Sequence, residues 1–288
     1  MSMILEGRTL ANNIRQPLAK RAEVARQKLG RAIRLCAIGS TEDYGAYVYL
    51  NKEVQAAQKL GVETQIFEVN NQTSPDQFLA RVENLSADPN VDAILIPRPL
   101  PPHLAATDFA DRLAPQKDID GMSNSNMGHL FLCKTWAEIC ALKGFVSCTA
   151  MAVIKLLEHY DIDLAGKEVA VIGRSSTVGR PLAHLLTAKN ATVKICHRRT
   201  DLPRAVKDAD IICSAAGCPG LLQADWLKPG ATVIDISTNW HDNHLCGDTN
   251  PEALAAKNIS YSPVPGGVGP ITLAVLLENI ILSGERKI

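Results

Sequence analysis

The chain has 288 residues, and its 30 lysines and arginines balance its 30 aspartates and glutamates. A balanced charge gives no basic surface for a nucleic acid or an acidic membrane, so we expect neither partner. Hydrophobic residues make up 46% of the sequence and charged residues 21%, a globular composition that excludes a disordered chain. At this length the chain can form two hydrophobic cores of ordinary size.

Neither a membrane segment nor a metal site is expected from the sequence. Glu6 and Arg8 interrupt the N-terminal apolar residues too early for a secretory signal. The longest apolar stretch, residues 271–282, is broken by Glu278 and Asn279 and is too short to span a bilayer. The eight cysteines form no Cys-x-x-Cys pair, and several lie in apolar runs. We therefore expect a cytoplasmic protein with reduced thiols.

The first half of the chain alternates helices and strands. Apolar positions at helical spacing predict one helix over residues 8–29. The elements expected after it are strand 34–38, helix 46–60, strand 63–69, helix 75–87 and strand 93–96. The last of these strands ends in a proline-rich run at residues 97–102, which cannot continue a sheet.

The second half repeats this alternation. The elements expected there are helix 150–160, strand 167–172, helix 181–189, strands 192–196, 211–214 and 232–236, and helix 270–282. Strands that alternate with helices predict parallel sheets with helical crossovers. The sequence therefore predicts an α/β fold of two domains, with a boundary near residues 140–150.

Two glycines stand between a predicted strand and a predicted helix, in the run Gly173-Arg174-Ser175-Ser176-Thr177-Val178-Gly179. The first glycine permits a tight turn, and the second permits close packing where the helix begins. Free N–H groups at the start of such a helix face a pyrophosphate. This strand–loop–helix pattern predicts a Rossmann-like site for a nicotinamide dinucleotide.

Arginines near the expected position of the adenosine ribose favour NADP over NAD. Arg198 and Arg199 follow the next strand, and with Arg174 they supply guanidinium groups that can hold a 2′-phosphate. No acidic residue ends that strand to accept the two ribose hydroxyls of NAD. For Arg199, a solvated turn residue is the stronger interpretation.

Three motifs in order resemble the methylenetetrahydrofolate dehydrogenase/cyclohydrolase family over nearly the whole chain. They are Gly173-Arg174-Ser175-x-x-Val178-Gly179-x-Pro181, Lys117-Asp118-x-Asp120-Gly121, and Pro263-Val264-Pro265-Gly266-Gly267-Val268-Gly269-Pro270-x-Thr272. The resemblance implies a folate-binding catalytic domain over residues 1–145 with 270–288. It also implies an NAD(P)-binding Rossmann domain over residues 146–269, and a homodimer.

The family carries a Tyr, and a Lys four residues later, on the helix after its first strand. Counting back from Gly61 at the helix end places this pair on Tyr49 and Glu53, whereas counting forward from the strand places it on Tyr47 and Asn51. The two counts differ because the segment is two residues longer than usual. An insertion in the preceding loop is tolerated better than one inside a helix, so we adopt the backward count.

Lys52 adjoins the expected lysine position in either count. One residue along a helix means a rotation of about 100°, so we expect Lys52 to point elsewhere unless the helix is distorted. It is kept as a catalytic candidate together with Tyr49, Glu53 and Asp120. The resemblance implies that the Asp120 carboxylate accepts a hydrogen bond from the amino edge of the pterin.

Further departures from the family lie near both expected pockets. Pro97 replaces the Gln of the family run Val-Gln-Leu-Pro-Leu-Pro, and Ser237 replaces a usual Gly. Residues 147–152 read Ser-Cys-Thr-Ala-Met-Ala where the family usually has Pro-Cys-Thr-Pro-x-Gly. The substrate contacts implied by the resemblance are Tyr47, Pro97, Pro265, Gly266 and Gly267. The implied cofactor contacts are Gly173, Arg174, Ser175, Val178, Gly179, Arg198, Ser237 and Thr238.

The two reactions of this family make different demands. Oxidation of methylenetetrahydrofolate moves a hydride to the nicotinamide and needs orientation more than an acid or base. Hydrolysis of the methenyl cation needs proton transfers, in which the lysine and its Gln partner matter. A carboxylate at Glu53 would instead favour the cationic product by charge complementarity. We therefore expect an NAD(P)-dependent methylenetetrahydrofolate dehydrogenase with weak or absent cyclohydrolase activity.

Two other functions and a second cofactor stay open at this point. The changes at Glu53, Pro97, Ala150 and Ser237 together suggest a paralogue redirected to another pterin-like or imine substrate. A non-catalytic folate or nucleotide binder is the other alternative. NADP-using members commonly carry Ser at the position of Arg198, whereas an Arg there resembles the NAD-using mitochondrial type, which recruits phosphate and magnesium. NAD is therefore the alternative to NADP.

Overall fold

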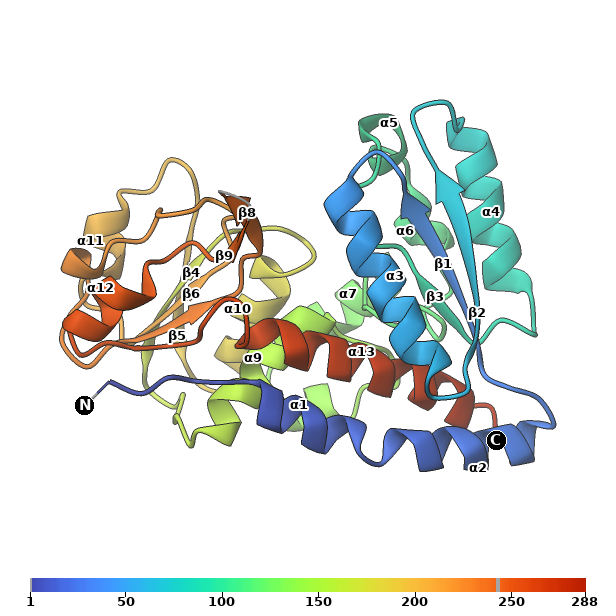
Figure 1. Ribbon diagram of the computed structural model, residues 1–288, viewed down its shortest axis with the longest axis horizontal. Coiled ribbons are helices and arrows are strands. Elements are labelled where there is room, and N and C mark those ends of the chain that lie inside the picture. Colours follow the sequence, from blue (N-terminus) through green and yellow to red (C-terminus); the bar gives the residue numbers. More distant parts are fainter. Residues whose placement is uncertain (1, 242–243) are drawn as a thin grey trace. The chain divides into compact units, whose positions relative to one another are not determined.

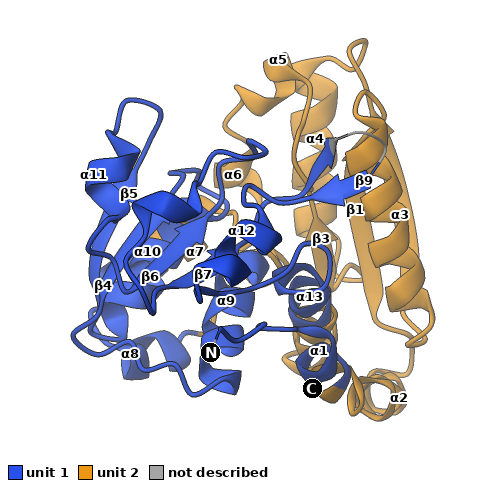
Figure 2. Ribbon diagram, turned by 60° about the vertical axis from the view of Figure 1, so that its left-hand side comes forward, with its two compact units in different colours: residues 1–12, 130–142, 147–275 blue, residues 13–129, 143–146, 276–288 orange. Residues whose placement is uncertain are grey.

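The computed structural model describes residues 2–241 and 244–288, which form two compact units (Figure 2). Unit 1 contains residues 1–12, 130–142 and 147–275, and unit 2 contains residues 13–129, 143–146 and 276–288. These limits differ from those predicted, because the N-terminal segment pairs with unit 1: Leu5 N–H donates to the Tyr261 carbonyl at 2.8 Å. The last boundary between the two units falls between residues 275 and 276, inside the C-terminal helix.

Unit 2 is built on a parallel sheet of three strands, in the order β2-β1-β3. The strands are β1 (Arg34–Ser40), β2 (Glu63–Val69) and β3 (Ala93–Leu95). Helix α3 (Tyr44–Gln58) lies on one side of them and α4 (Pro75–Ala87) on the other (Figure 1). The parallel arrangement predicted from strand–helix alternation is confirmed.

Shorter helices complete unit 2. Their bounds are α2 (Leu18–Leu29), α5 (Pro102–Ala105), α6 (Phe109–Arg112) and α7 (Asn124–Leu132), the last reaching into unit 1. The single helix predicted over residues 8–29 is wrong. The chain forms α1 (Arg8–Arg15) and then α2, with Pro17 at the start of α2. Proline has no N–H to donate to the preceding turn, so the helix is interrupted there.

Unit 1 contains a parallel sheet of five strands in the order β10-β7-β6-β4-β5. The strands are β4 (Glu168–Ile172), β5 (Thr192–Cys196), β6 (Ile211–Ser214), β7 (Thr232–Asp235) and β10 (Ser260–Tyr261). The chain order reverses between β4 and β6. In open α/β sheets, ligands bind at the carboxyl ends of the strands beside such a reversal.

Helices pack on both faces of this sheet. The remaining elements of unit 1 are α8 (Trp136–Cys140), α9 (Cys148–His159), α10 (Gly179–Ala188), α11 (Leu202–Val206), η1 (Ala224–Trp226), β8 (Asn239–His241), β9 (His244–Cys246) and α12 (Pro251–Ala256). One core joins α11, η1 and α12 to the inner residues of β4, β6 and β7. Helix α10 packs on α9 and on β4 and β5. The two-domain α/β class predicted from the sequence is confirmed.

The chain ends in the apolar helix α13 (Val268–Glu285). By length and composition this helix could cross a membrane, but 56% of it is buried, as in the core helix of a globular protein. In unit 2, the Arg21 guanidinium of α2 forms two hydrogen bonds to the Glu285 carboxylate, at 2.9 and 2.7 Å. Burial and these ionic bonds together hold the end of α13 to unit 2.

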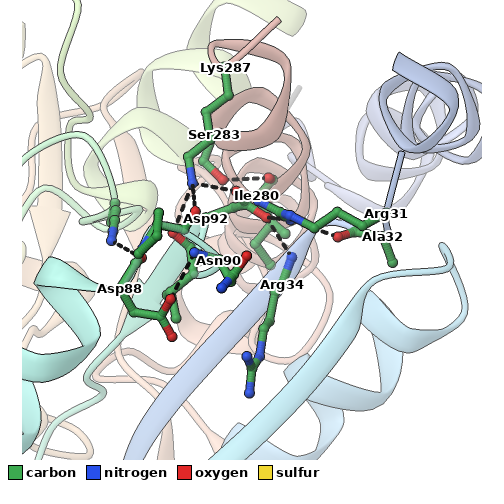
Figure 3. A network of polar contacts seen from close by, with 12 residues as sticks. Arg31, Ala32, Arg34, Asp88, Asn90, Asp92, Ile280, Ser283 and Lys287 are labelled. Atoms are coloured by element: carbon green, nitrogen blue, oxygen red, sulfur yellow. Dashed lines mark hydrogen bonds and ion pairs between the residues drawn. The ribbon is translucent and has the colours of Figure 1, made fainter. Parts of the chain in front are cut away.

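A buried carboxylate also joins the chain end to the sheet of unit 2 (Figure 3). Asp92 has no exposed surface, and it accepts two hydrogen bonds from Arg31, at 2.6 and 2.9 Å, and one from the Arg34 N–H at 2.8 Å. The Lys287 ammonium lies 2.6 Å from its Oδ1 atom. Burial alone would raise the pKa of Asp92, but the bonds from Arg31, Lys287 and Arg34 outweigh it and hold the pKa below 3.8.

We predict that Asp92→Asn lowers the free energy of unfolding by about 2 kcal/mol at pH 7, the scale of a hydrogen bond to a charged group. Because the native pKa lies below the unfolded value, the stabilisation is present above pH 3.8 and is lost as the pH falls through the native pKa. Urea unfolding of both proteins from pH 7 to pH 3 measures this difference. A difference that grows in acid would contradict the assignment, and Asp208→Asn, at an exposed aspartate, is the control.

Candidate functional site

Helix α3 places two predicted site residues on one face of unit 2. The Asp43 side chain starts the helix, because its Oδ1 accepts a hydrogen bond from the Ala46 N–H at 2.9 Å. Tyr49 and Glu53 are four residues apart, so they lie one above the other on the same face. Tyr49 is 43% exposed, whereas Glu53 is 6% exposed.

Lys52, the third candidate on this helix, is not brought to the same place. Its side chain is exposed, while that of Glu53 is buried. This agrees with the rotation of about 100° between neighbouring helix positions. The structure therefore places a carboxyl group, and no ammonium group from α3, on the buried side of the helix at this level.

The Lys117–Gly121 loop holds Asp120, the fourth candidate. The Lys117 ammonium donates to three carbonyls at the end of α4, at 2.6 to 3.1 Å, and the Asp118 carboxylate accepts the N–H groups of Met122 and Ser123. Asp118 also pairs with Ile94 in a parallel bridge, so the segment runs alongside β3. Both flanking charges hold the loop in place, and the charge of Asp120, between them and Gly121, acts on Glu53.

Glu53 and Asp120 interact electrostatically. Burial raises the pKa of Glu53 to about 8, and the neighbouring Asp120 contributes in the same direction. The buried Oε2 atom of Glu53 has no hydrogen-bond partner among the described residues. At neutral pH the Glu53 carboxyl group is therefore mainly protonated, an unusual state for a glutamate and one common at functional sites.

The predicted substrate contacts differ in what they offer. In unit 2, the Tyr47 hydroxyl already donates a hydrogen bond to the Glu68 carboxylate of β2. Pro97 lies two residues after the end of β3. In unit 1, Gly266 and Gly267 are buried and serve backbone packing. A Cβ on Gly267 would lie 2.8 Å from the Pro263 carbonyl oxygen, whereas Pro265 is exposed.

The glycine loop of unit 1 has the close packing expected of a dinucleotide loop. A Cβ on Gly179 would lie 2.2 Å from the Gly173 carbonyl oxygen, and one on Gly173 would lie 2.6 Å from the Ala215 carbonyl oxygen. The Ser175 hydroxyl accepts hydrogen bonds from the N–H groups of Val178 and Gly179, at 3.1 and 3.3 Å. The loop therefore has a fixed shape at the start of α10, beside the reversal between β4 and β6.

The predicted ribose-side arginines are exposed. Arg198 and Arg199 lie in a turn closed by the Thr200 N–H, which donates to the His197 carbonyl at 2.7 Å. Arg174, inside the glycine loop, is exposed as well. All three guanidinium groups are thus on the surface of unit 1, at the ends of β4 and β5.

The last two predicted cofactor contacts behave differently from each other. Ser237 is buried; its hydroxyl donates to Asp248 at 2.7 Å and accepts the Gly217 N–H at 3.0 Å, so it braces the protein itself. Thr238 is exposed. Ser237 therefore bridges the segments that follow β6 and β7.

Asp248 was missed by sequence reasoning, although it joins more segments than any predicted residue of unit 1. Its carboxylate accepts from Ser214 at 2.7 Å, from the N–H groups of Ala216 and Cys218 at 2.9 and 2.7 Å, and from Ser237. It fixes the loop that follows β6, against which Gly173 packs. Asp248 stands outside any strand–helix motif, so its spacing in the sequence carried no signal.

Comparisons with known proteins agree with this geometry. Residues 5–120 match the model of the tetrahydrofolate dehydrogenase/cyclohydrolase catalytic domain, and residues 147–288 match the model of the NAD(P)-binding domain of the same family. The bifunctional protein FolD of Elusimicrobium minutum is 50% identical over 288 residues, covering 99% of this chain and 100% of the relative.

Two solved structures extend the likeness to three dimensions. The bifunctional FolD methylenetetrahydrofolate dehydrogenase/cyclohydrolase of Campylobacter jejuni superposes with a TM-score of 0.91 at 33% identity, with 100% of each chain covered. The methylenetetrahydrofolate dehydrogenase-cyclohydrolase of Trypanosoma brucei, solved with NADP and an inhibitor, gives a TM-score of 0.88 at 29% identity, with 99% of this chain and 98% of that one covered. The chain therefore belongs to the tetrahydrofolate dehydrogenase/cyclohydrolase family.

Proposed function

We propose that this protein is an NADP-dependent methylenetetrahydrofolate dehydrogenase whose cyclohydrolase activity is weak or absent. The observation that carries the second part is the buried Glu53 carboxyl, which occupies the helix position where the family has its lysine. The first part rests on the full-length match to folate enzymes and on the intact glycine loop.

The residues of unit 1 fit a nicotinamide dinucleotide. The close approaches at Gly173 and Gly179 leave no room for side chains, so a pyrophosphate can come near the backbone at the start of α10. When bound, the nicotinamide supplies a hydride acceptor. Arg174 and Arg198 would hold a 2′-phosphate by charge-assisted hydrogen bonds, and the NADP in the Trypanosoma brucei structure supports this choice over NAD.

The residues of unit 2 are suited to orienting the folate. Asp120 would accept hydrogen bonds from the pterin amino edge, and the half-exposed Tyr49, one helical turn from Glu53, offers an aromatic ring. Hydride transfer from the methylene carbon needs this orientation and proximity, because the adjacent nitrogen lone pair stabilises the positive charge that forms.

Hydrolysis of the methenyl cation, unlike hydride transfer, needs an acid–base group. Water must add to the cationic carbon and protons must move, and a positioned acid–base group typically contributes about 10²–10⁴ in rate. The lysine and Gln that serve this step in the family are Glu53 and Pro97 here, and Lys52 lies on the exposed side of α3. Proline has no side-chain group that could move a proton.

The substrate class, the oligomeric state and the location in the cell are also proposals. Full-length identity to folate enzymes favours a folate substrate over a redirected substrate or a non-catalytic binder. Homodimer formation is proposed from the family resemblance, and a cytoplasmic location from the cysteines, five of which are buried and none of which forms a disulfide among the described residues.

We predict that NADPH forms readily from methylenetetrahydrofolate and NADP, while methenyltetrahydrofolate hydrolysis is slower than in a lysine-bearing relative by about 10²–10⁴. The double variant Glu53→Lys/Pro97→Gln should raise the rate of methenyltetrahydrofolate hydrolysis. Adding Lys52→Ala to it should leave that rate unchanged. Absorbance of the reduced nicotinamide and of the methenyl group measures the two reactions separately. Brisk hydrolysis by the unmodified enzyme that Lys52→Ala abolishes would overturn the proposal.

We predict that Arg198→Ser raises the KM for NADP about tenfold, the scale of one hydrogen bond to a charged group, and leaves the KM for NAD unchanged. Arg199→Ser, at the neighbouring exposed position, is the matched control and should have a smaller effect. Initial rates with each cofactor, with and without inorganic phosphate, provide the measurement. An unchanged NADP preference in Arg198→Ser would remove the 2′-phosphate role from this residue.

A further inference from the structure

The Glu53 carboxyl is an anomaly within unit 2. Its side chain is 6% exposed, and its Oε2 is buried without a hydrogen-bond partner among the described residues. A buried polar atom that lacks a partner costs about 1–3 kcal/mol, so a protein keeps one only where something else is gained. A ligand bound beside Asp120 is the natural source of that gain.

The charged groups described on the elements around Glu53 do not offset the cost of burying its carboxyl group. Among the residues described, Asp120 is the charge that affects its pKa, and this charge has the same sign as an ionised Glu53. On α3 itself, Lys52 is exposed.

The two strands that pack against α3 offer no compensating cation either. On β1, Arg34 pairs with Glu63 of β2 at 3.5 Å, and Cys36 is a buried thiol whose pKa is raised by burial. On β2, Glu68 binds the Tyr47 hydroxyl. The described residues of these elements thus place no cation beside the Glu53 carboxyl group. A positively charged ligand bound there would be stabilised by it.

We propose that Glu53 balances the positive charge that the reaction creates on the folate: it is a neutral acid beside the methylene substrate and a carboxylate beside the methenyl cation. This inference rests on the proposed dehydrogenase function and adds a catalytic role for a residue that replaces the lysine of the family.

The charges in the step balance. A hydride leaves the methylene carbon with the electron pair of its C–H bond and passes to the nicotinamide, so the folate gains one positive charge. The Glu53 carboxylic acid loses its proton to solvent and gains one negative charge. Two opposite charges then face each other in a buried place, where their attraction is far stronger than in water. Above the pKa of Glu53 the carboxylate is already present, so hydride transfer is faster there.

The pH dependence of dehydrogenation tests this role. Burial, with Asp120, raises the pKa of Glu53 to about 8, so the carboxylate fraction increases through the assay range. We expect kcat/KM for methylenetetrahydrofolate to rise about tenfold from pH 7 to pH 9, since a carboxyl group with a pKa of about 8 is about one-tenth ionised at pH 7 and about nine-tenths ionised at pH 9. In Glu53→Gln, which cannot ionise, the ratio of the two values should be close to one.

Matched variants separate a catalytic role from a structural one. Glu53→Asp keeps a titrating carboxyl and should restore part of the rise, and Gln55→Ala, at an exposed position of the same helix, should keep all of it. Dehydrogenation by Glu53→Gln that still rises as in the unmodified enzyme would overturn the inference. Absence of NADPH formation by the unmodified enzyme at every pH would instead overturn the proposed function.

Thermal unfolding gives a readout that needs no folate. The native pKa of Glu53 lies above the unfolded value of 4.5, so the native state holds a proton that the unfolded state has lost. The cost of the buried group therefore grows from pH 4.5 to pH 8 and is constant above pH 8. Glu53→Gln should raise the melting temperature more at pH 8.5 than at pH 5. An equal shift at both pH values would show that Glu53 is not buried as an acid, and would overturn the inference.

Discussion

The Lys117–Gly121 loop is the constraint on which the chemistry of unit 2 depends. The Lys117 ammonium donates hydrogen bonds to the carbonyls that end α4, and the Asp118 carboxylate accepts hydrogen bonds from the N–H groups of its own turn. These bonds fix the loop, and with it Asp120, beside β3. Burial is the main cause of the raised pKa of Glu53, and the Asp120 charge on this loop raises it further.

The expected site residues of the two units are under different physical constraints. In unit 1, Gly173 and Gly179 approach neighbouring backbone so closely that substitution would displace the loop, which explains why the nucleotide motif is intact. In unit 2, Glu53 is a helix position where a change of side chain alters chemistry without disturbing the backbone, whereas proline at position 97 also fixes φ and removes an N–H. Physical constraint is therefore strongest where the cofactor is held and weakest where the second reaction would be catalysed.

Sequence patterns predicted local structure well and long-range polar contacts poorly. The strands and helices from residue 34 to 95 were placed within two residues, because apolar periodicity and turn residues are local signals. The helix expected over residues 8–29 was wrong because helical spacing continues across Pro17 while the backbone cannot. Asp248 was missed because the partners of its carboxylate lie 9 to 34 residues away, and only the folded sheet brings them together.

A lysine and a glutamate at the same buried helix position have opposite electrostatic effects on a cationic folate. A lysine repels the methenyl cation and can take part in proton transfers, so it favours hydrolysis of that cation. A buried acid beside Asp120 stays neutral until a cation arrives, and then stabilises it. At position 53, where the family resemblance implies a lysine, a glutamate would thus do more than remove a catalytic group. A lysine there would repel the methenyl cation, whereas a carboxylate would stabilise it as the product of the proposed dehydrogenase.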